Sequence, residues 1–284
     1  MKHSLLIALL TAGFHCVSYA DTEPVIVDDN KILRSFAKDL GNLAEAESTV
    51  HTDALLPQLG RKSCTITLPE APTEKLKNVY RSVTDSVVVI GSIYKCDKCP
   101  NWHTGSLATA WVLTSDGVMV TNYHVFKGKE AAGFGVYTLD GKVSPIVEIL
   151  AASERDDVAI FRVKGEGFKP LAMGVDAGVG DSIHIIAHPD KRFYTYTAGN
   201  ISRYYRKPSR IGGRMDSMAV TAEFAGGSSG GPVVNGLGHV VGMVASTQSI
   251  YHPSKDKKRD PKGNFQMVIR NCVPVASIRK LIEK

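Results

Sequence analysis

The sequence predicts an all-β protein made of two antiparallel barrels or sandwiches that lie side by side. Short β-branched segments follow one another from Val87 to Val163, separated by turn signals such as SDG and LDG. A second series of the same kind continues to Arg270. No helical pattern separates the two series, which argues against alternating helices and strands. A cleft between two such groups of strands is a natural place for a catalytic or binding site.

The first 20 residues have the pattern of a secretory signal peptide. A lysine precedes an apolar run from Leu5 to about Phe14, and small residues lie just before Asp21. The run is too short to span a bilayer comfortably, and no later segment approaches a membrane-spanning length. We therefore expect residues 1–20 to be removed. The remaining protein is expected to be exported, periplasmic or secreted, without a membrane anchor after cleavage.

Residues 21–75 differ from the strand-rich part and predict a partly helical N-terminal extension. Asn30 can cap a helix in which apolar residues recur at intervals of 3, 4 and 3, so that they share one face. These residues are Leu33, Phe36, Leu40 and Leu43. We expect this face to pack on the main domain; a partner-binding or pro-segment role is the alternative.

The main domain is expected over residues 76–284. The first group of strands is placed at about 79–165 and the second at about 170–272. The tail VASIRKLIEK follows Pro274 and has helical spacing, which predicts a short C-terminal helix over about 275–283.

The net charge of the whole chain is +6, which is mild for 284 residues. Part of it lies in KDKKRDPKG, residues 255–263, which is expected to be a solvated loop rather than a polyanion-binding patch. The charge pattern therefore predicts no nucleic-acid partner.

Four cysteines follow the predicted signal peptide: Cys64, Cys96, Cys99 and Cys272. In an oxidising compartment, disulfides are the first expectation, and four cysteines allow three connectivities. The CxxC pair is followed by His103, so zinc is an alternative, although only three ligands are visible where a structural site uses four. Reduced or redox-active thiols are the third alternative. We assign no metal ligands, and we expect no cofactor.

The segment EFAGGSSGGPVVNG, Glu223 to Gly236, has the composition of a nucleophile loop. A hydroxyl needs a base to remove its proton, and an attacked carbonyl needs donors already directed at its developing charge. Glycines let consecutive amides point into one small space. Elsewhere, TNYHVF ends a hydrophobic strand at His124, and SERDDVAIFRV places acids before another strand.

These three segments, in the order His, Asp, Ser, resemble trypsin-like (chymotrypsin-fold) serine proteases, most closely the bacterial HtrA/Deg group. The segments GVGDSIHIIAHP, TAGNIS and GSSGGPVVNGLGHVVGMV add to the resemblance, which covers about residues 79–281. It implies two six-stranded antiparallel barrels. It also implies a serine endopeptidase that acts on protein or peptide substrates through an acyl-enzyme intermediate.

The resemblance also assigns the site residues. The family nucleophile directly precedes Gly-Gly-Pro, which selects Ser229 over Ser228. The family acid directly precedes an aliphatic residue and alanine, which selects Asp157, and the histidine of TNYHV is His124. The amides of Gly227 and Ser229 are implied as the oxyanion hole.

The specificity pocket is less closely matched, because the loop before Ser229 is a residue shorter than the usual HtrA form. Counting back from the nucleophile places Glu223 near the selectivity acid of trypsin. The opposite wall is expected at Ala245, Ser246 and Thr247. A preference for basic side chains, a preference for small or aliphatic ones, and a solvent-facing Glu223 are the alternatives.

No PDZ domain is expected, and the resemblance leaves oligomerisation open. The first alternative function is a catalytically silent binding or adhesion protein on the same scaffold. A metal or redox protein built on Cys96, Cys99 and His103 is the second, and an esterase with the same triad is the third.

Overall fold

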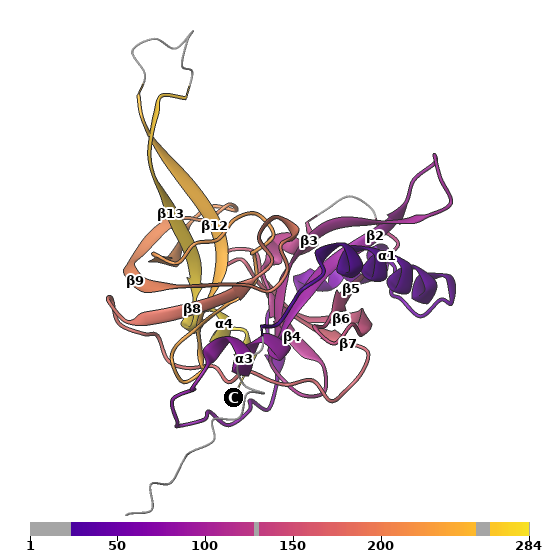
Figure 1. Cartoon of the computed structure of the whole chain (residues 1–284), viewed down its shortest axis with the longest axis horizontal. Helices are drawn as coiled ribbons and strands as arrows, with labels where there is room; N and C mark the ends of the chain where they lie inside the picture. The colour runs from indigo at the N-terminus through magenta and orange to yellow at the C-terminus, as the bar shows by residue number, and fades with distance from the viewer. Residues whose placement is uncertain (1–23, 128–130, 254–261, 284) are drawn as a thin grey trace, which may run out of the picture.

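The structure is a computed structural model that describes residues 24–127, 131–253 and 262–283. The predicted signal peptide, residues 1–20, and most of the charged 255–263 loop lie outside the described residues. Figure 1 shows two groups of strands side by side, with the earlier part of the chain in one group and the later part in the other.

The first group is a closed barrel with the strand order β2-β3-β4-β7-β6-β5, and all of its pairings are antiparallel. Its first strand, β2, begins with four β-branched residues that are fully buried, as the apolar run predicts. The strands are β2 (Val87–Lys95), β3 (Trp102–Val112), β4 (Val118–Thr121), β5 (Gly133–Tyr137), β6 (Val143–Ser153) and β7 (Val158–Val163).

The second group is also a closed antiparallel barrel, with the order β10-β13-β12-β11-β8-β9. Together the two barrels confirm the predicted fold class. The strands are β8 (Ser182–Ala187), β9 (Thr195–Pro208), β10 (Arg214–Val220), β11 (Pro232–Val234), β12 (Val240–His252) and β13 (Asn264–Pro274).

One hydrophobic cluster joins the two barrels. It contains Val120 and Ile160 of the first barrel and Ile186 and Val234 of the second, each at most 1% exposed. Because both barrels contribute side chains to the same buried cluster, they are held against each other by apolar burial as well as by the chain.

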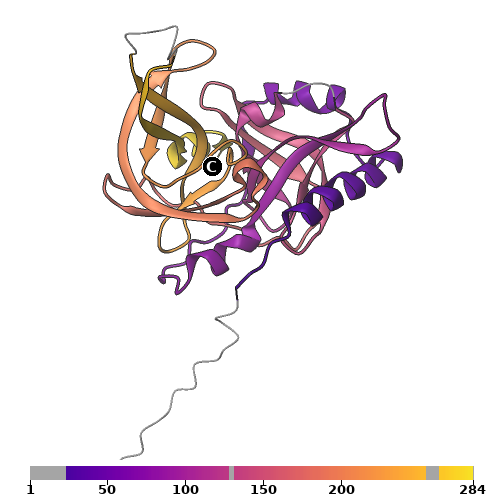
Figure 2. The same cartoon turned by 45° about the horizontal axis from the view of Figure 1, so that its top comes forward.

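The N-terminal helix α1 (Asp29–Glu45) packs on the first barrel, as predicted, through the fully buried Phe36 and Leu40. Figure 2 shows α1 lying along this barrel. The helix begins earlier than expected: Asp28, not Asn30, is the N-cap, and its carboxylate accepts from the amide of Lys31. Both residue types can cap a helix, so local sequence alone did not decide between them.

The predicted C-terminal helix is shorter than expected. Helix α4 (Val275–Arg279) is followed by the short strand β14 (Ile282–Glu283), which pairs in parallel with β1 (Cys64–Thr65). The prediction of a helix to residue 283 was therefore wrong, because pairing with a distant segment takes the last residues out of the helix. The remaining helices are α2 (Thr52–Leu55) and α3 (Val79–Val83), with 3-10 helices η2 (Leu56–Gly60), η3 (Thr84–Ser86), η4 (Tyr123–Phe126) and η5 (Pro189–Lys191).

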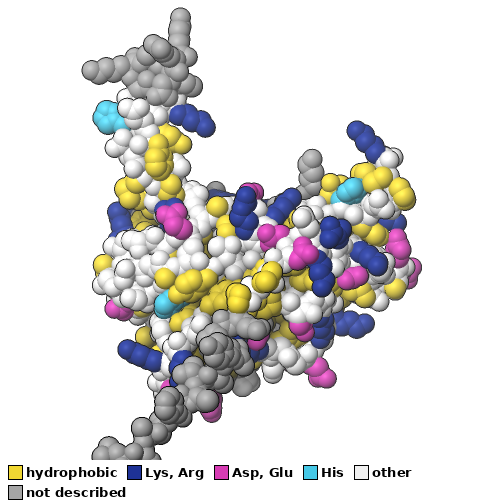
Figure 3. Space-filling view, viewed as in Figure 1, with side chains coloured by type: hydrophobic (Ala, Val, Ile, Leu, Met, Phe, Trp, Pro, Cys, Tyr) yellow, Lys and Arg dark blue, Asp and Glu magenta, His cyan; other side chains and the backbone are white. Residues whose placement is uncertain are grey.

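Strands β12 and β13 continue beyond the second barrel as a projecting two-stranded arm (Figure 1). Apolar side chains lie on the arm's surface, where Figure 3 shows yellow atoms. Phe265 and Met267 are 56% and 51% exposed there. None of the helices in the described ranges is long and apolar enough to cross a membrane.

Candidate active site

His124 lies on the first barrel, in the 3-10 turn η4 that directly follows β4. Strand β4 is fully buried, so the turn at its end begins from a fixed position. The neighbouring Asn122 is also buried, and its side-chain amide donates to the carbonyl oxygen of Asp157 at 2.9 Å. This bond ties the histidine turn to the segment that carries the candidate acid.

Asp157 directly precedes β7 and faces His124. Its Oδ2 lies 2.8 Å from Nδ1 of His124, and its Oδ1 accepts from the backbone amide of the same histidine at 3.0 Å. The Asp157 side chain is 15% exposed and the His124 side chain is 23% exposed. Asp157 has a φ of 58°, a conformation that is uncommon for a residue with a side chain and that often occurs at functional sites. The imidazole is thus held in one orientation, with Nε2 free to act.

The two adjacent serines of the glycine-rich loop have different environments. Ser228 is fully buried, and its hydroxyl has no hydrogen-bond partner among the described residues. Ser229 is partly exposed. Of the two hydroxyls, only that of Ser229 is therefore within reach of a substrate.

The serine loop belongs to the second barrel but packs on the first. The amide of Thr109, on β3, donates to the carbonyl oxygen of Ser229 at 2.9 Å. Gly230 has a φ of +87°, and a Cβ there would overlap the Thr109 carbonyl oxygen and the Thr121 hydroxyl. Thr121 is three residues before His124. The packing therefore places the candidate nucleophile beside the strand end that carries the candidate base.

The histidine and the serine are not hydrogen-bonded to each other. The Ser229 hydroxyl donates instead to the carbonyl oxygen of Ala245, at 3.3 Å. Nε2 of His124 has no hydrogen-bond partner in the part of the chain that the structure describes. The hydroxyl must turn away from Ala245 before the base can take its proton, and hydrogen bonds of this kind often form only once substrate is bound.

The candidate oxyanion donors lie in the same loop. Gly227 has a φ of +93°, and its carbonyl oxygen accepts from the Thr109 hydroxyl at 2.9 Å. The amides of Gly227 and Ser229 have no hydrogen-bond partner within the described ranges. Two unpaired amides with a fixed loop conformation can bind an anion without first breaking another bond.

His188 packs against this loop, and its local sequence does not mark it as a site residue. Its Nδ1 accepts from the Tyr194 amide at 3.0 Å, and its own amide donates to the Thr109 hydroxyl at 3.2 Å. A Cβ at Gly227 would overlap its carbonyl oxygen. Complete burial lowers the pKa of His188 to about 3, so the ring is neutral at ordinary pH. Its position follows from the fold, and a histidine after a strand is not distinctive by itself.

Two of the predicted pocket residues, Glu223 and Thr247, lie beside Arg270, a residue that the sequence pattern did not indicate. The carboxylate of Glu223 is paired with the Arg270 guanidinium. Arg270 lies opposite Thr247 in the β12–β13 register, and on β12 Ala245 is buried while Ser246 is partly buried. Glu223 thus faces solvent, as one of the alternatives expected, but its carboxylate is paired rather than free.

The four described cysteines, Cys64, Cys96, Cys99 and Cys272, are all free, so the predicted disulfides are not formed in the structure. Cys64 and Cys272 lie in separate places: Cys64 is on β1, and its thiol donates to the carbonyl oxygen of Leu281. Cys272 is fully buried on β13, and burial raises the pKa of its thiol. Cys96 and Cys99 form a separate cluster with His103.

Comparison with known proteins agrees with the resemblance predicted from the sequence. Residues 108–243 match the family described as a trypsin-like peptidase domain. Serine protease HTRA1 of Xenopus laevis is 30% identical over 258 residues, which cover 83% of this chain and 54% of that protein. Protease Do-like 5, chloroplastic, of Arabidopsis thaliana is 28% identical over 200 residues, 61% of each chain.

Solved structures show the same fold. The structure of HtrA-type protease AlgW with a decapeptide has a TM-score of 0.56 and 19% identity, and covers 70% of this chain and 64% of that one. The present chain spans 22% to 61% of the length of the first four curated relatives. These matches confirm the predicted resemblance to trypsin-like, HtrA-like serine proteases.

Proposed function

We propose that this trypsin-like, HtrA-like chain is an exported serine endopeptidase that hydrolyses peptide bonds through His124, Asp157 and Ser229. One observation carries the proposal. The Asp157 carboxylate lies within 2.8 Å of Nδ1 of His124, while the serine loop of the other barrel packs against Thr109 and Thr121 of the barrel that holds the histidine. These contacts support a site at the junction of the barrels, in which Asp157 orients the base and Ser229 supplies the hydroxyl.

The reaction begins when a substrate carbonyl enters beside Ser229. The hydroxyl leaves the Ala245 carbonyl, gives its proton to Nε2 of His124 and attacks the carbonyl carbon. Asp157 holds Nδ1–H and stabilises the imidazolium that forms. The imidazolium then returns the proton to the leaving amine, which leaves an acyl-enzyme on Ser229. Water, activated by the same histidine, releases the acyl group.

The negative charge on the attacked oxygen needs donors that are already in place. The unpaired amides of Gly227 and Ser229 supply two. Their loop is held by hydrogen bonds from the Thr109 hydroxyl to the Gly227 carbonyl and from the Asp190 amide to the Gly226 carbonyl, so little reorganisation accompanies the reaction.

An extended peptide is the proposed substrate class. The similar structure of an HtrA-type protease with a decapeptide supports this choice. The pocket walls proposed here are Ala245, Ser246 and Thr247 on β12, with the Glu223–Arg270 pair at the side. Because the carboxylate of Glu223 is already paired, we propose small or aliphatic side chains rather than basic ones.

Export is the proposed location. A protein of Chlamydia trachomatis named as a probable periplasmic serine endoprotease, DegP-like, is 30% identical over 146 residues, which cover 51% of this chain and 29% of that protein. The residues proposed as a signal peptide, 1–20, support export on the sequence pattern alone.

The adjacent serines provide a matched test. We expect the wild-type chain to cleave a peptide library and to be labelled on Ser229 by a fluorophosphonate. Ser229→Ala should abolish labelling and lower turnover by about 10⁴-fold or more, the magnitude known for this kind of triad. Ser228→Ala should retain both, because its buried hydroxyl makes no hydrogen bond among the described residues.

Three outcomes would contradict the proposal. Equal cleavage by wild type and Ser229→Ala would assign the activity to a contaminant. A folded wild-type protein that neither cleaves peptides nor reacts with the probe would favour the silent binding protein instead. Faster hydrolysis of matched esters, with no amide cleavage, would indicate an esterase.

A further inference from the structure

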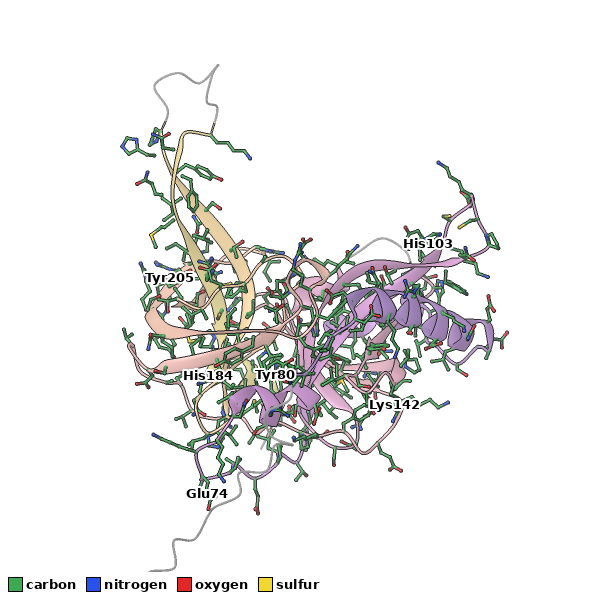
Figure 4. All side chains as sticks on the ribbon, viewed as in Figure 1. Glu74, Tyr80, His103, Lys142, His184 and Tyr205 are labelled. Atoms are coloured by element: carbon green, nitrogen blue, oxygen red, sulfur yellow. The ribbon has the colours of Figure 1, made fainter. Side chains whose placement is uncertain are left out.

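The β2–β3 hairpin carries a cluster of three metal-ligating side chains at its tip. Cys96 and Cys99 lie in the loop between the strands, and His103 is the second residue of β3. The register pairs Lys95 with Trp102 and Tyr94 with His103, so the hairpin brings Cys96 and His103 to the same end. Figure 4 shows His103 near the end of this projecting hairpin.

The three ligand atoms lie close together. The Cys96 and Cys99 sulfurs are 3.5 Å apart, and Nε2 of His103 lies 3.3 Å from the first and 3.0 Å from the second. One small space thus receives one atom from each side chain. All three residues are partly buried.

These distances fit a tetrahedral ion better than a disulfide. A sulfur–sulfur bond is about 2.05 Å long, so the cysteines are not bonded to each other. Zinc bonds of about 2.3 Å to sulfur and 2.0 Å to nitrogen place tetrahedral ligands roughly 3.8 Å (S–S) and 3.5 Å (S–N) apart. The observed spacings are shorter by a few tenths of an ångström, which small side-chain rotations can provide. A disulfide would also not explain why Nε2 of His103 lies within 3.3 Å of both sulfurs, whereas a shared metal ion would.

We propose that Cys96, Cys99 and His103 bind a zinc ion, with water as the fourth ligand. Two thiolates and one imidazole form a ligand set that suits Zn²⁺ rather than a hard cation such as Mg²⁺ or Ca²⁺. Binding replaces the two thiol protons by two Zn–S bonds and uses the lone pair of Nε2, so two protons are released and no electron is transferred. This inference departs from the sequence-based expectation of disulfides and no metal ligands, and it does not rest on the proposed protease activity.

The ion would fix the hairpin tip beside helix α1. Trp102, next to His103, donates from Nε1 to Glu45 at 3.0 Å, and Lys95 donates to the same carboxylate at 2.9 Å. The Tyr94 and His103 rings lie 5.5 Å apart. A hollow of about 560 Å³ lies between α1 and this end of the hairpin, and His103 lines it. Cross-linking the tip would therefore stabilise one wall of the hollow.

The full chain, purified in reductant without chelator, tests the proposal. We expect one zinc ion per chain by elemental analysis. Substitution with Co²⁺ should produce tetrahedral ligand-field bands and a thiolate charge-transfer band. Cys96→Ser, Cys99→Ser and His103→Asn should each lose these signals. The matched control is Cys64→Ser, which alters a distant thiol on β1 and should keep them.

A second measurement covers variants that fold poorly. In the wild-type protein, a thiol reagent should release the zinc as Cys96 and Cys99 are modified, and mass spectrometry should locate the modification. The proposal is overturned if the reduced wild type binds no more zinc than the variants. It is also overturned if His103→Asn retains full binding, or if a stable Cys96–Cys99 disulfide forms in place of the metal complex.

Discussion

Arg270 on β13 is paired with Glu223 in the loop that leads to Ser229. The Arg270 side chain is 14% exposed, whereas that of Glu223 is 73% exposed. Arg270 also lies opposite Thr247 in the β12–β13 register. The positive charge of Arg270 thus lies beside the Glu223 carboxylate. That carboxylate is the group that would have to attract a basic substrate side chain in the proposed pocket.

Removing this cation should make the proposed protease more tolerant of basic residues. For Arg270→Gln we expect kcat/KM on peptides with Lys or Arg before the cleaved bond to rise about two- to fivefold relative to peptides with Val. The gain is small because the carboxylate is well exposed to water, and exposed ion pairs contribute at most about 1 kcal/mol. The double variant Arg270→Gln with Glu223→Gln should return to the wild-type ratio. An equal gain in the double variant would show that Glu223 does not face the substrate.

The neighbouring glycines Gly226 and Gly227 should respond very differently to alanine. At Gly227 the backbone has a φ of +93° and a Cβ would overlap the His188 carbonyl oxygen, whereas a Cβ at Gly226 meets nothing within 4 Å. Gly227→Ala should shift a proposed oxyanion donor and lower kcat by about 10²- to 10³-fold. Gly226→Ala should stay close to wild type. Peptide cleavage rates, compared at equal amounts of folded protein, check this, and similar losses for the two variants would contradict it.

Buried His188 should make the protein less stable as the pH falls. The pKa of His188 is about 3 in the folded protein and near 6.5 in the unfolded chain. Between these two pH values the histidine is protonated in the unfolded chain but neutral in the folded protein. The contribution to stability is complete above about pH 6.5 and declines toward pH 3, by up to roughly 1.4 kcal/mol per pH unit. Urea unfolding between pH 4.5 and 7.5 measures the slope.

The matched variants for this prediction are His188→Asn and His252→Asn. Asparagine at 188 can accept from the Tyr194 amide as Nδ1 of the histidine does, but it does not titrate. We expect His188→Asn to flatten the pH dependence, whatever its effect on stability at pH 7. His252 is exposed, so its variant should keep the wild-type slope. An unchanged slope in His188→Asn would contradict the prediction.

Alanine at Gly41 should destabilise the protein although it favours the helix. Helix propensity alone predicts a gain of about 0.5–1 kcal/mol. However, a Cβ at Gly41 would overlap the five-membered ring of the Trp102 indole. Overpacking of this kind costs about 1–3 kcal/mol, so we expect a net loss of roughly 1 kcal/mol in the free energy of unfolding. Gly60→Ala is the control, since nothing lies within 4 Å of its Cβ position. Denaturant titration of both variants measures the free energy of unfolding. A Gly41→Ala variant more stable than wild type would show that helix propensity outweighs the overpacking.

The candidate site could be predicted largely because each member lies in a distinctive local sequence. TNYHV, DDVAIF and GSSGGP each couple a polar residue to the strand or turn that presents it. The same locality explains what was missed. The role of Arg270 depends on strand register and that of His188 on complete burial, and neither property can be read from neighbouring residues.

Most of the fold could also be predicted from local sequence patterns. Runs of β-branched residues indicated the two barrels, because strand preference and burial act on the same segments. The end of the chain was not predictable from its own residues. Ile282 pairs with Cys64, more than 200 positions away, and that long-range contact overrides the helical spacing of the tail.

Helix α1 touches both halves of the molecule. Phe36 and Leu40 are buried against the first barrel, and the Asp29 carboxylate accepts from the amide of Phe193, beside the second barrel's β9. Proteolytic removal of this helix would expose the apolar barrel surface that Phe36 and Leu40 cover. Burial of two such side chains stabilises the folded state by about 3–6 kcal/mol. It would also remove the hydrogen bond between Asp29 and the Phe193 amide, which ties the helix to the segment before β9. We therefore expect proteolytic trimming at this end to inactivate the proposed protease rather than to activate it.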